Sequence, residues 1–322
     1  MFLPTTIREV RERGWDALDV ILFTGDAYVD HPSFGAAVIG RLLEAEGYRV
    51  AVVPQPNWQD DLRDFRKLGT PRLFFGVTAG AMDSLVNHYT ANLRLRSNDA
   101  YTPGGKAGFR PDRAVEVYTR ILKRLFPRVP VVIGGIEASL RRLTHYDYWS
   151  DALRPPILVT SGADLLIYGM GDGVVERVAR AMHNGYNAKL LRNIPQVGFL
   201  ADSSYVGRLD PARTIRLRSF EECTADPRAM GDNFTVIETQ SNLMEPTATL
   251  VEPAGDRFMV LTPPLSAAEA GDLDRSFDLP YERAPHPRYA GRGAIPAWEM
   301  IKHSVNTVSY THLRAHETAA NL

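Results

Sequence analysis

Short runs of β-branched and apolar residues recur along the first 190 residues, and helical patterns separate them. The runs cover residues 19–24, 48–53, 72–77, 129–133 and 163–168. Continuous apolar character over so few residues is typical of strands that are buried on both faces. Helical periodicity follows in between, over residues 32–46, 59–68, 81–88 and 174–184. Strands that alternate with helices in this way predict a parallel sheet with right-handed crossovers.

This alternation predicts an α/β domain over residues 1–190. We expect a Rossmann-like or flavodoxin-like, mostly parallel sheet with helices on both faces. From residue 191 the pattern changes, because short strand candidates lie among prolines and a short helix candidate follows them. These candidates cover residues 196–200, 233–237 and 257–261 for the strands and 266–277 for the helix. Residues 191–306 are therefore expected to form a smaller, irregular α+β segment that acts as a linker.

The charge balance excludes several classes of protein. The chain has 37 Lys and Arg residues against 38 Asp and Glu residues, for a formal net charge of −1. Dedicated nucleic-acid binders carry a clear basic excess. No apolar stretch approaches the roughly 18 residues that a membrane span needs, and the start of the chain has no apolar signal segment. We expect a cytoplasmic protein that has neither a membrane nor a nucleic-acid partner.

Cys223 is the only cysteine. One thiol excludes an intramolecular disulfide, a Cys-x-x-Cys redox pair and an iron–sulfur cluster held by thiolates of this chain. Cys223 lies in a polar stretch without a neighbouring residue of catalytic type, so we interpret it as an incidental thiol.

Glycine-bearing turns follow four of the predicted strands. Their candidate ligand-binding residues are Thr24, Gly25, Asp26, Thr78, Gly80, Gly134, Gly135, Glu137, Gly169, Gly171 and Asp172. The carboxyl ends of parallel strands meet at one edge of a sheet, so these turns are expected to converge on a crevice there. Bare glycine backbone and helix N-termini could approach a ligand closely at this edge. The alternative for each single glycine is ordinary turn chemistry.

Asp30 and His31 follow the first of these turns. They could form an acid–base pair or a metal site, whereas Pro32 favours a plain helix start. Cobalamin-binding domains carry Asp-x-His-x-x-Gly at this point of the fold. Here the Asp and the His are adjacent, so a histidine-ligated cobalamin is not supported.

Two further segments carry candidate chemistry. His145, Tyr146 and Asp147 open a run of aromatic and acidic residues that could stack on a flat ligand or simply pack the domain edge. Residues 92–113 form a long loop with a local surplus of three positive charges, typical of either an anion-binding lid or a solvated loop.

Several long, ordered segments resemble the N-terminal region of the YgiQ family. They cover residues 20–35, 74–80, 99–103, 134–142, 145–151, 279–287 and 295–301. The resemblance implies a radical S-adenosylmethionine protein. Such a protein has a Rossmann-like N-terminal domain, followed by a partial TIM-type barrel that holds a 4Fe–4S cluster on a Cys-x3-Cys-x2-Cys loop. The reaction and substrate of this family are unassigned.

The end of the chain departs from the family pattern. The resemblance places the cluster cysteines a few residues after position 306, but residues 307–322 contain none and look like translated vector sequence. We expect this tail to be non-native, so the i, i+4 pair of His312 and His316 is interpreted as accidental rather than as a zinc site. The chain is then a truncated fragment without the barrel, and it is expected to bind no cluster and to be inactive alone.

Three functional hypotheses follow. The first is the N-terminal part of a YgiQ-type radical S-adenosylmethionine enzyme, whose crevice binds an unknown small-molecule substrate or a cofactor. The second is a stand-alone nucleotide- or cobalamin-type binding module without catalysis. The third is a cluster-independent transferase or hydrolase that uses Asp26, Asp30, His31 and Glu137. The first also predicts an exposed apolar surface where the barrel is missing, and self-association through it.

Overall fold

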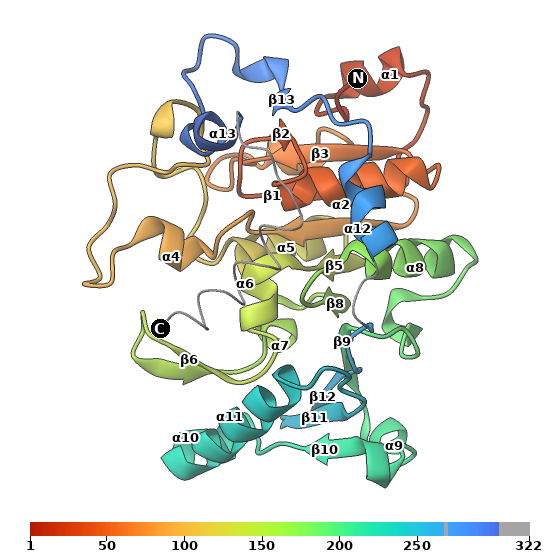
Figure 1. The fold of residues 1–322 in the computed structure, drawn as a ribbon, viewed down its shortest axis with the longest axis vertical. Coiled ribbons are helices and arrows are strands. Elements are labelled where there is room, and N and C mark those ends of the chain that lie inside the picture. Colours follow the sequence, from red (N-terminus) through yellow and green to blue (C-terminus); the bar gives the residue numbers. More distant parts are fainter. Residues whose placement is uncertain (267–269, 303–322) are drawn as a thin grey trace.

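The computed structural model describes residues 1–266 and 270–302. Within them, the centre is a nine-stranded sheet, in which the five predicted strands form a continuous parallel block (Figure 1). These are β1 (Val20–Thr24), β3 (Val50–Pro54), β4 (Phe74–Thr78), β5 (Val131–Ile133) and β8 (Leu165–Ile167). They lie in the order β3-β1-β4-β5-β8, and every neighbouring pair is parallel. The predicted α/β fold class is therefore confirmed.

The sheet continues without a break past residue 190. The additional strands are β9 (Val197–Ala201), β12 (Arg257–Leu261), β11 (Thr249–Ala254) and β10 (Thr214–Arg216). β9 pairs antiparallel with β8, and β12 pairs antiparallel with both β9 and β11. β10 then adds at the edge, parallel to β11. The strands expected at 196–200 and 257–261 are confirmed, and they extend the parallel sheet with antiparallel strands.

The strand expected at 233–237 is wrong, because these residues lie within the helix α11 (Pro227–Ser241). The side chain of Asp226 caps this helix by accepting a hydrogen bond from the backbone N–H of Arg228, and Pro227 occupies its first turn. Both features favour a helix start strongly enough to override the β-branched run around Val236.

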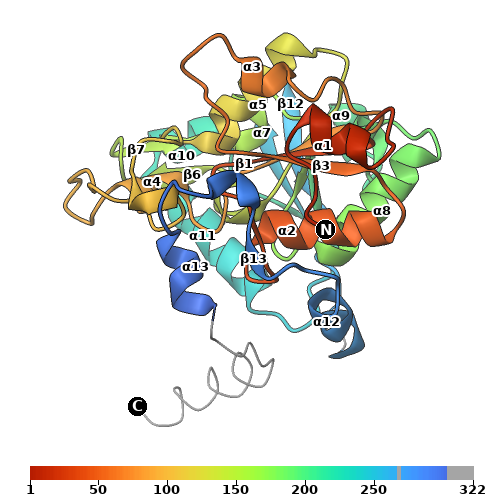
Figure 2. The same ribbon diagram turned by 90° about the horizontal axis from the view of Figure 1, so that it is seen from above.

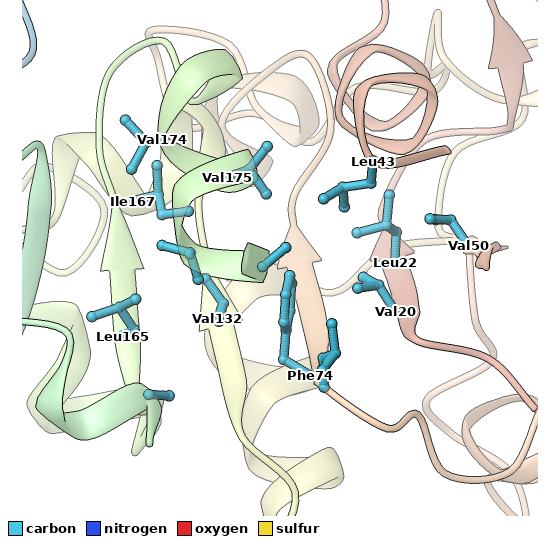
Figure 3. Close-up of a cluster of buried hydrophobic side chains, with 14 of the residues drawn as sticks. Val20, Leu22, Leu43, Val50, Phe74, Val132, Leu165, Ile167, Val174 and Val175 are labelled. Atoms are coloured by element: carbon cyan, nitrogen blue, oxygen red, sulfur yellow. The ribbon is translucent and has the colours of Figure 1, made fainter. Parts of the chain in front are cut away.

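Helices cover both faces of the parallel strands (Figure 2). One face packs against α2 (Gly35–Ala45) and α8 (Asp172–His183), and the other against α3 (Arg63–Arg66), α5 (Ala114–Leu125) and α7 (Ile157–Ser161). Side chains alternate along β1 accordingly: Val20 and Leu22 join the α2–α8 core, shown in Figure 3, whereas Ile21 and Phe23 join the other. The apolar residues of α5 repeat at helical spacing, but this helix is not among the predicted ones.

Shorter elements surround this core. They are α1 (Ile7–Glu12), β2 (Val29–Asp30), α4 (Ser84–His88), α6 (Gly135–Leu140), β6 (His145–Asp147), β7 (Ala152–Arg154), α9 (Ser203–Val206), α10 (Phe220–Ala225), α12 (Ala270–Phe277), β13 (Ala284–Pro285) and α13 (Pro296–Ile301). β13 pairs with β2, which brings the end of the described chain back to the turn after β1. Within residues 1–266 and 270–302, none of the helices combines the length and apolar composition that a membrane crossing needs.

Candidate functional site

The order of the parallel strands reverses beside β1. The chain places β3 on one side of β1 and then adds β4, β5 and β8 on the other side. The segments that follow the two adjacent strands β1 and β4 lead to helices on opposite faces of the sheet, α2 and α5. Ligands of open α/β sheets bind at such a reversal, beyond the carboxyl ends of the strands. The helices that follow β1 and β8, α2 and α8, lie on the same face of the sheet (Figures 2 and 3).

A crevice of about 440 Å³ opens at this edge. Side chains of the sheet line its inner part, including Leu22, Phe74, Val132 and Ile167. Ile39 of α2 and Val175 of α8 line it from the two helices, and Ser276 and Phe277 line it from the end of α12. The crevice is therefore apolar inside, and the turns after β4, β5 and β8 form its mouth.

Two glycines at the mouth adopt backbone conformations that other residues rarely adopt. Gly80 has φ +112° and Gly135 has φ +82°. A Cβ atom at Gly80 would collide with the carboxyl group of Asp26, and one at Gly135 would collide with the Thr78 hydroxyl. Glycine is required at both positions, and it lets neighbouring turns approach each other closely.

The structure places the turns after β4, β5 and β8 at the crevice, but only some of the candidate residues line it. Those that do are Thr78, Gly80, Gly134, Gly135, Gly169, Gly171 and Asp172. The other candidate residues do not line the crevice, and they contact other parts of the protein instead.

Asp26 belongs to a buried ion-pair cluster behind the mouth. Its carboxylate lies 2.7 Å from Arg110, which also pairs with Asp99 at 3.2 Å. The backbone N–H of Ala81 donates to Asp26 at 2.6 Å. Burial raises the pKa of Asp26 to about 6, against the lowering effect of the Arg110 guanidinium. This cluster ties the long loop that contains Arg110 to the turns after β1 and β4.

Thr24 and Gly25 support the same turn. The Thr24 hydroxyl accepts a hydrogen bond from the backbone N–H of Asp26 at 3.3 Å. Gly25 packs against the carbonyl oxygen of Ala79, where a side chain would not fit. Both residues therefore stabilise a turn beside the mouth of the crevice, but neither of them lines it.

The loop of residues 92–113 has less free positive charge than its sequence suggests. Arg110 is fully engaged by the two carboxylates of the buried cluster, and Arg113 pairs with Asp147. Arg94, Arg96 and Lys106 remain exposed. Two of the five cations expected to attract an anion are therefore neutralised by internal partners.

Asp30 and His31 have separate structural partners. Asp30 is completely buried and forms an ion pair with Arg41. It also accepts hydrogen bonds from the hydroxyl of Tyr28 at 3.1 Å and the backbone N–H of Glu282 at 2.9 Å. His31 Nδ1 accepts from the backbone N–H of Ser33 at 3.1 Å, and burial lowers the pKa of its imidazole. Neither residue lines the crevice.

Glu137 is also buried, below the mouth. Its carboxylate accepts hydrogen bonds from the backbone N–H groups of Ser84 at 3.0 Å and Val115 at 2.9 Å. It therefore joins α6 to the starts of α4 and α5. Burial raises the pKa of Glu137, with Arg141 acting in the opposite direction.

The hairpin β6–β7 carries the remaining candidates, away from the crevice lining. His145 Nδ1 lies 3.0 Å from the carbonyl oxygen of Leu143, and burial lowers the pKa of its ring. Tyr146 is exposed and donates to Asp151 at 2.6 Å. Asp147 is buried in its pair with Arg113.

Sequence reasoning missed the helical part of the lining. Ile39 and Val175 lie within the first two turns of helices that follow predicted glycine turns, so the helical pattern itself could have indicated them. Ser276 and Phe277 had no such signal, because α12 reaches the crevice from 104 residues beyond Asp172. Their position depends on the path of the chain after the sheet.

The described residues do not fit a 4Fe–4S cluster. Cys223 is buried in α10, where the side-chain amide of Asn233 donates to its sulfur at 3.3 Å, and burial raises the pKa of its thiol to about 11. Among residues 1–266 and 270–302, no group of three or more His, Cys, Asp and Glu side chains could hold a metal ion. His312 and His316 lie outside the described residues.

Comparison with known proteins identifies the family. Residues 2–304 match the family model described as "Radical SAM N-terminal". A UPF0313 protein of Porphyromonas gingivalis is 59% identical over 306 residues, which cover 95% of this chain and 48% of the relative. UPF0313 proteins of Bacteroides thetaiotaomicron and Thermotoga maritima are 54% and 43% identical, with 95% and 99% of this chain and 50% and 56% of the relatives covered.

The match covers nearly all of this chain and about half of each relative. The chain spans about half the length of the curated relatives it matches. The family that the sequence motifs indicated is confirmed: the chain belongs to the radical SAM N-terminal family, among the YgiQ-type UPF0313 proteins.

Proposed function

We propose that this chain forms the N-terminal part of a YgiQ-type radical S-adenosylmethionine enzyme, and that its crevice binds a small-molecule substrate or cofactor of that enzyme. The position of the crevice carries the proposal. It lies at the reversal of strand order, where the glycine turns after β4, β5 and β8 converge and exclude bulky side chains. A 4Fe–4S cluster with S-adenosylmethionine would supply the radical chemistry, and the described residues would bind and orient the ligand.

The lining also favours binding over catalysis by this part of the molecule. Asp172 is the one ionisable side chain among the described residues that line the crevice. Asp26, Asp30 and Glu137 are engaged by internal donors, which gives no support to a transferase or hydrolase built on them. The second candidate function is therefore a binding module without catalysis, with the same crevice as its site.

Blocking the crevice tests this function in a complete enzyme. Ala36 lines the crevice from the first turn of α2, whereas Ala45 is exposed at the far end of the same helix. We suggest placing Trp at the positions aligned with Ala36 and Ala45 in the full-length Porphyromonas gingivalis relative, followed by anaerobic reconstitution. The measured quantity is the cleavage of S-adenosylmethionine that a cellular metabolite extract stimulates.

The variant at the position of Ala36 is expected to lose the stimulated cleavage, whereas the variant at the position of Ala45 keeps it. Equal stimulation in both variants would contradict a role for the crevice in the enzyme. Binding of metabolites by the crevice without any cleavage in the wild-type protein would favour the binding module instead.

A further inference from the structure

The inner part of the crevice suits an uncharged ring. The side chains that line this inner part from the sheet are aliphatic or aromatic. The whole crevice has a volume of about 440 Å³, within the roughly 300–1,000 Å³ typical of small-molecule sites. The turns at the mouth present bare peptide planes, because five of their lining residues are glycines: Gly80, Gly134, Gly135, Gly169 and Gly171. Flat peptide groups beside an apolar interior favour a planar heterocycle over a branched aliphatic ligand.

Polar side chains interrupt the apolar lining at Ser33, Thr78, Asp172 and Ser276, and the last two form a hydrogen-bonded pair. Asp172 begins α8, and its carboxylate accepts a hydrogen bond from the hydroxyl of Ser276 at 3.3 Å. Both residues line the crevice and come from segments far apart in the sequence. A carboxylate has further lone pairs, so it can accept two hydrogen bonds from neighbouring hydroxyl groups of a ligand. Acidic side chains near the strand ends of dinucleotide-binding sheets bind a ribose in this way.

The charge of the lining disfavours a phosphate. Among the described residues that line the crevice there is no Lys, Arg or His. The nearby Arg110 is already paired with Asp26 and Asp99. Asp172 lies in the first turn of α8, so its carboxylate already interacts with the positive end of this helix dipole. A phosphate in the crevice would therefore meet a carboxylate without a compensating cation.

From this lining we propose that the crevice binds a nucleoside and discriminates against the corresponding nucleotide. The base occupies the apolar interior, and the two ribose hydroxyls donate to Asp172 at the mouth. This inference rests on the proposed function of the crevice and names the class of its ligand.

Calorimetric titration of the purified 322-residue chain tests the proposal. The probes are adenosine, guanosine, cytidine and uridine, each compared with its 5′-monophosphate and its 2′-deoxy form. We expect at least one ribonucleoside to bind saturably. Its 2′-deoxy form should bind about tenfold more weakly or worse, because it lacks one hydrogen bond to the charged carboxylate of Asp172. Its monophosphate should also bind about tenfold more weakly or worse, because the phosphate meets this carboxylate without a compensating cation.

Two variants test whether Asp172 causes the preference for the ribonucleoside over its monophosphate. Asp172→Asn should weaken binding of the ribonucleoside about tenfold and narrow its advantage over the monophosphate, because the repelling charge is gone. Asp274→Asn removes an exposed carboxylate on α12 and should leave both affinities unchanged. Circular dichroism of each variant checks that it is folded.

The proposal is overturned if no ribonucleoside binds, if the monophosphates bind more tightly, or if Asp172→Asn has no effect. Loss of stimulated activity in the crevice-blocked full-length enzyme, combined with no nucleoside binding, would leave the proposed function standing and refute the ligand class. Nucleoside binding without any effect of the block on the enzyme would refute the proposed function alone.

Discussion

The free energy of unfolding is expected to fall between acidic and neutral pH because Glu252 ionises, and Glu252→Gln is expected to abolish this fall. Glu252 lies on β11 with no exposed surface. Its carboxyl group accepts hydrogen bonds from the backbone N–H of Thr144, at 3.0 Å, and from the hydroxyl of the same residue. Burial raises the pKa of Glu252 to about 7, although the bonds from Thr144 act to lower it.

The direction of the pH effect follows from this raised pKa. Above the ordinary pKa of 4.5, the unfolded chain releases the proton that the folded protein keeps until about pH 7. The free energy of unfolding therefore falls as the pH rises through this window and levels off above it. A pKa raised from 4.5 to about 7 corresponds to a change of about 3 kcal/mol in the free energy of unfolding.

Urea unfolding followed by circular dichroism at about pH 4.5, 6 and 8 measures the effect. Glutamine keeps the shape and can still bond Thr144, but it does not ionise. Relative to the wild type, Glu252→Gln should gain about 3 kcal/mol between the lowest and the highest pH. Glu245→Gln, at an exposed position, should follow the wild type. Parallel profiles for Glu252→Gln and the wild type would refute the reasoning.

Two further substitutions test the scaffold of the crevice. Arg110→Gln leaves the buried carboxylates of Asp26 and Asp99 without their cation, so urea unfolding should show a loss of about 3 kcal/mol; a loss below about 0.5 kcal/mol would contradict the cluster. Gly135→Ala must strain a positive φ and push the hydroxyl of Thr78 aside, which should cost about 2 kcal/mol in the same assay. Gly231→Ala, in the open middle of α11, should instead stabilise by up to about 1 kcal/mol, and equal effects of the two alanines would refute the strain argument.

Local pattern was enough for much of the fold. The five parallel strands could be predicted because a buried strand carries β-branched apolar residues almost without interruption. This pattern lies within the strand itself and does not depend on its neighbours in the fold. The same pattern misled at Val236, where the cap formed by Asp226 decided for a helix. The helix α5 was missed although Val115, Tyr118 and Leu122 repeat at helical spacing and are buried together.

The sequence by itself determined the family and the α/β fold with its parallel strands. Only the tertiary structure decided which candidate residues face the crevice. Asp30 and Glu137 look like catalytic acids in the sequence, yet their carboxylates are engaged by Arg41 and by backbone N–H groups of distant segments. Ser276 reaches Asp172 from 104 residues away. The reason is physical: the role of a carboxylate depends on its burial and its partners, and both come from long-range packing rather than from neighbours in the chain.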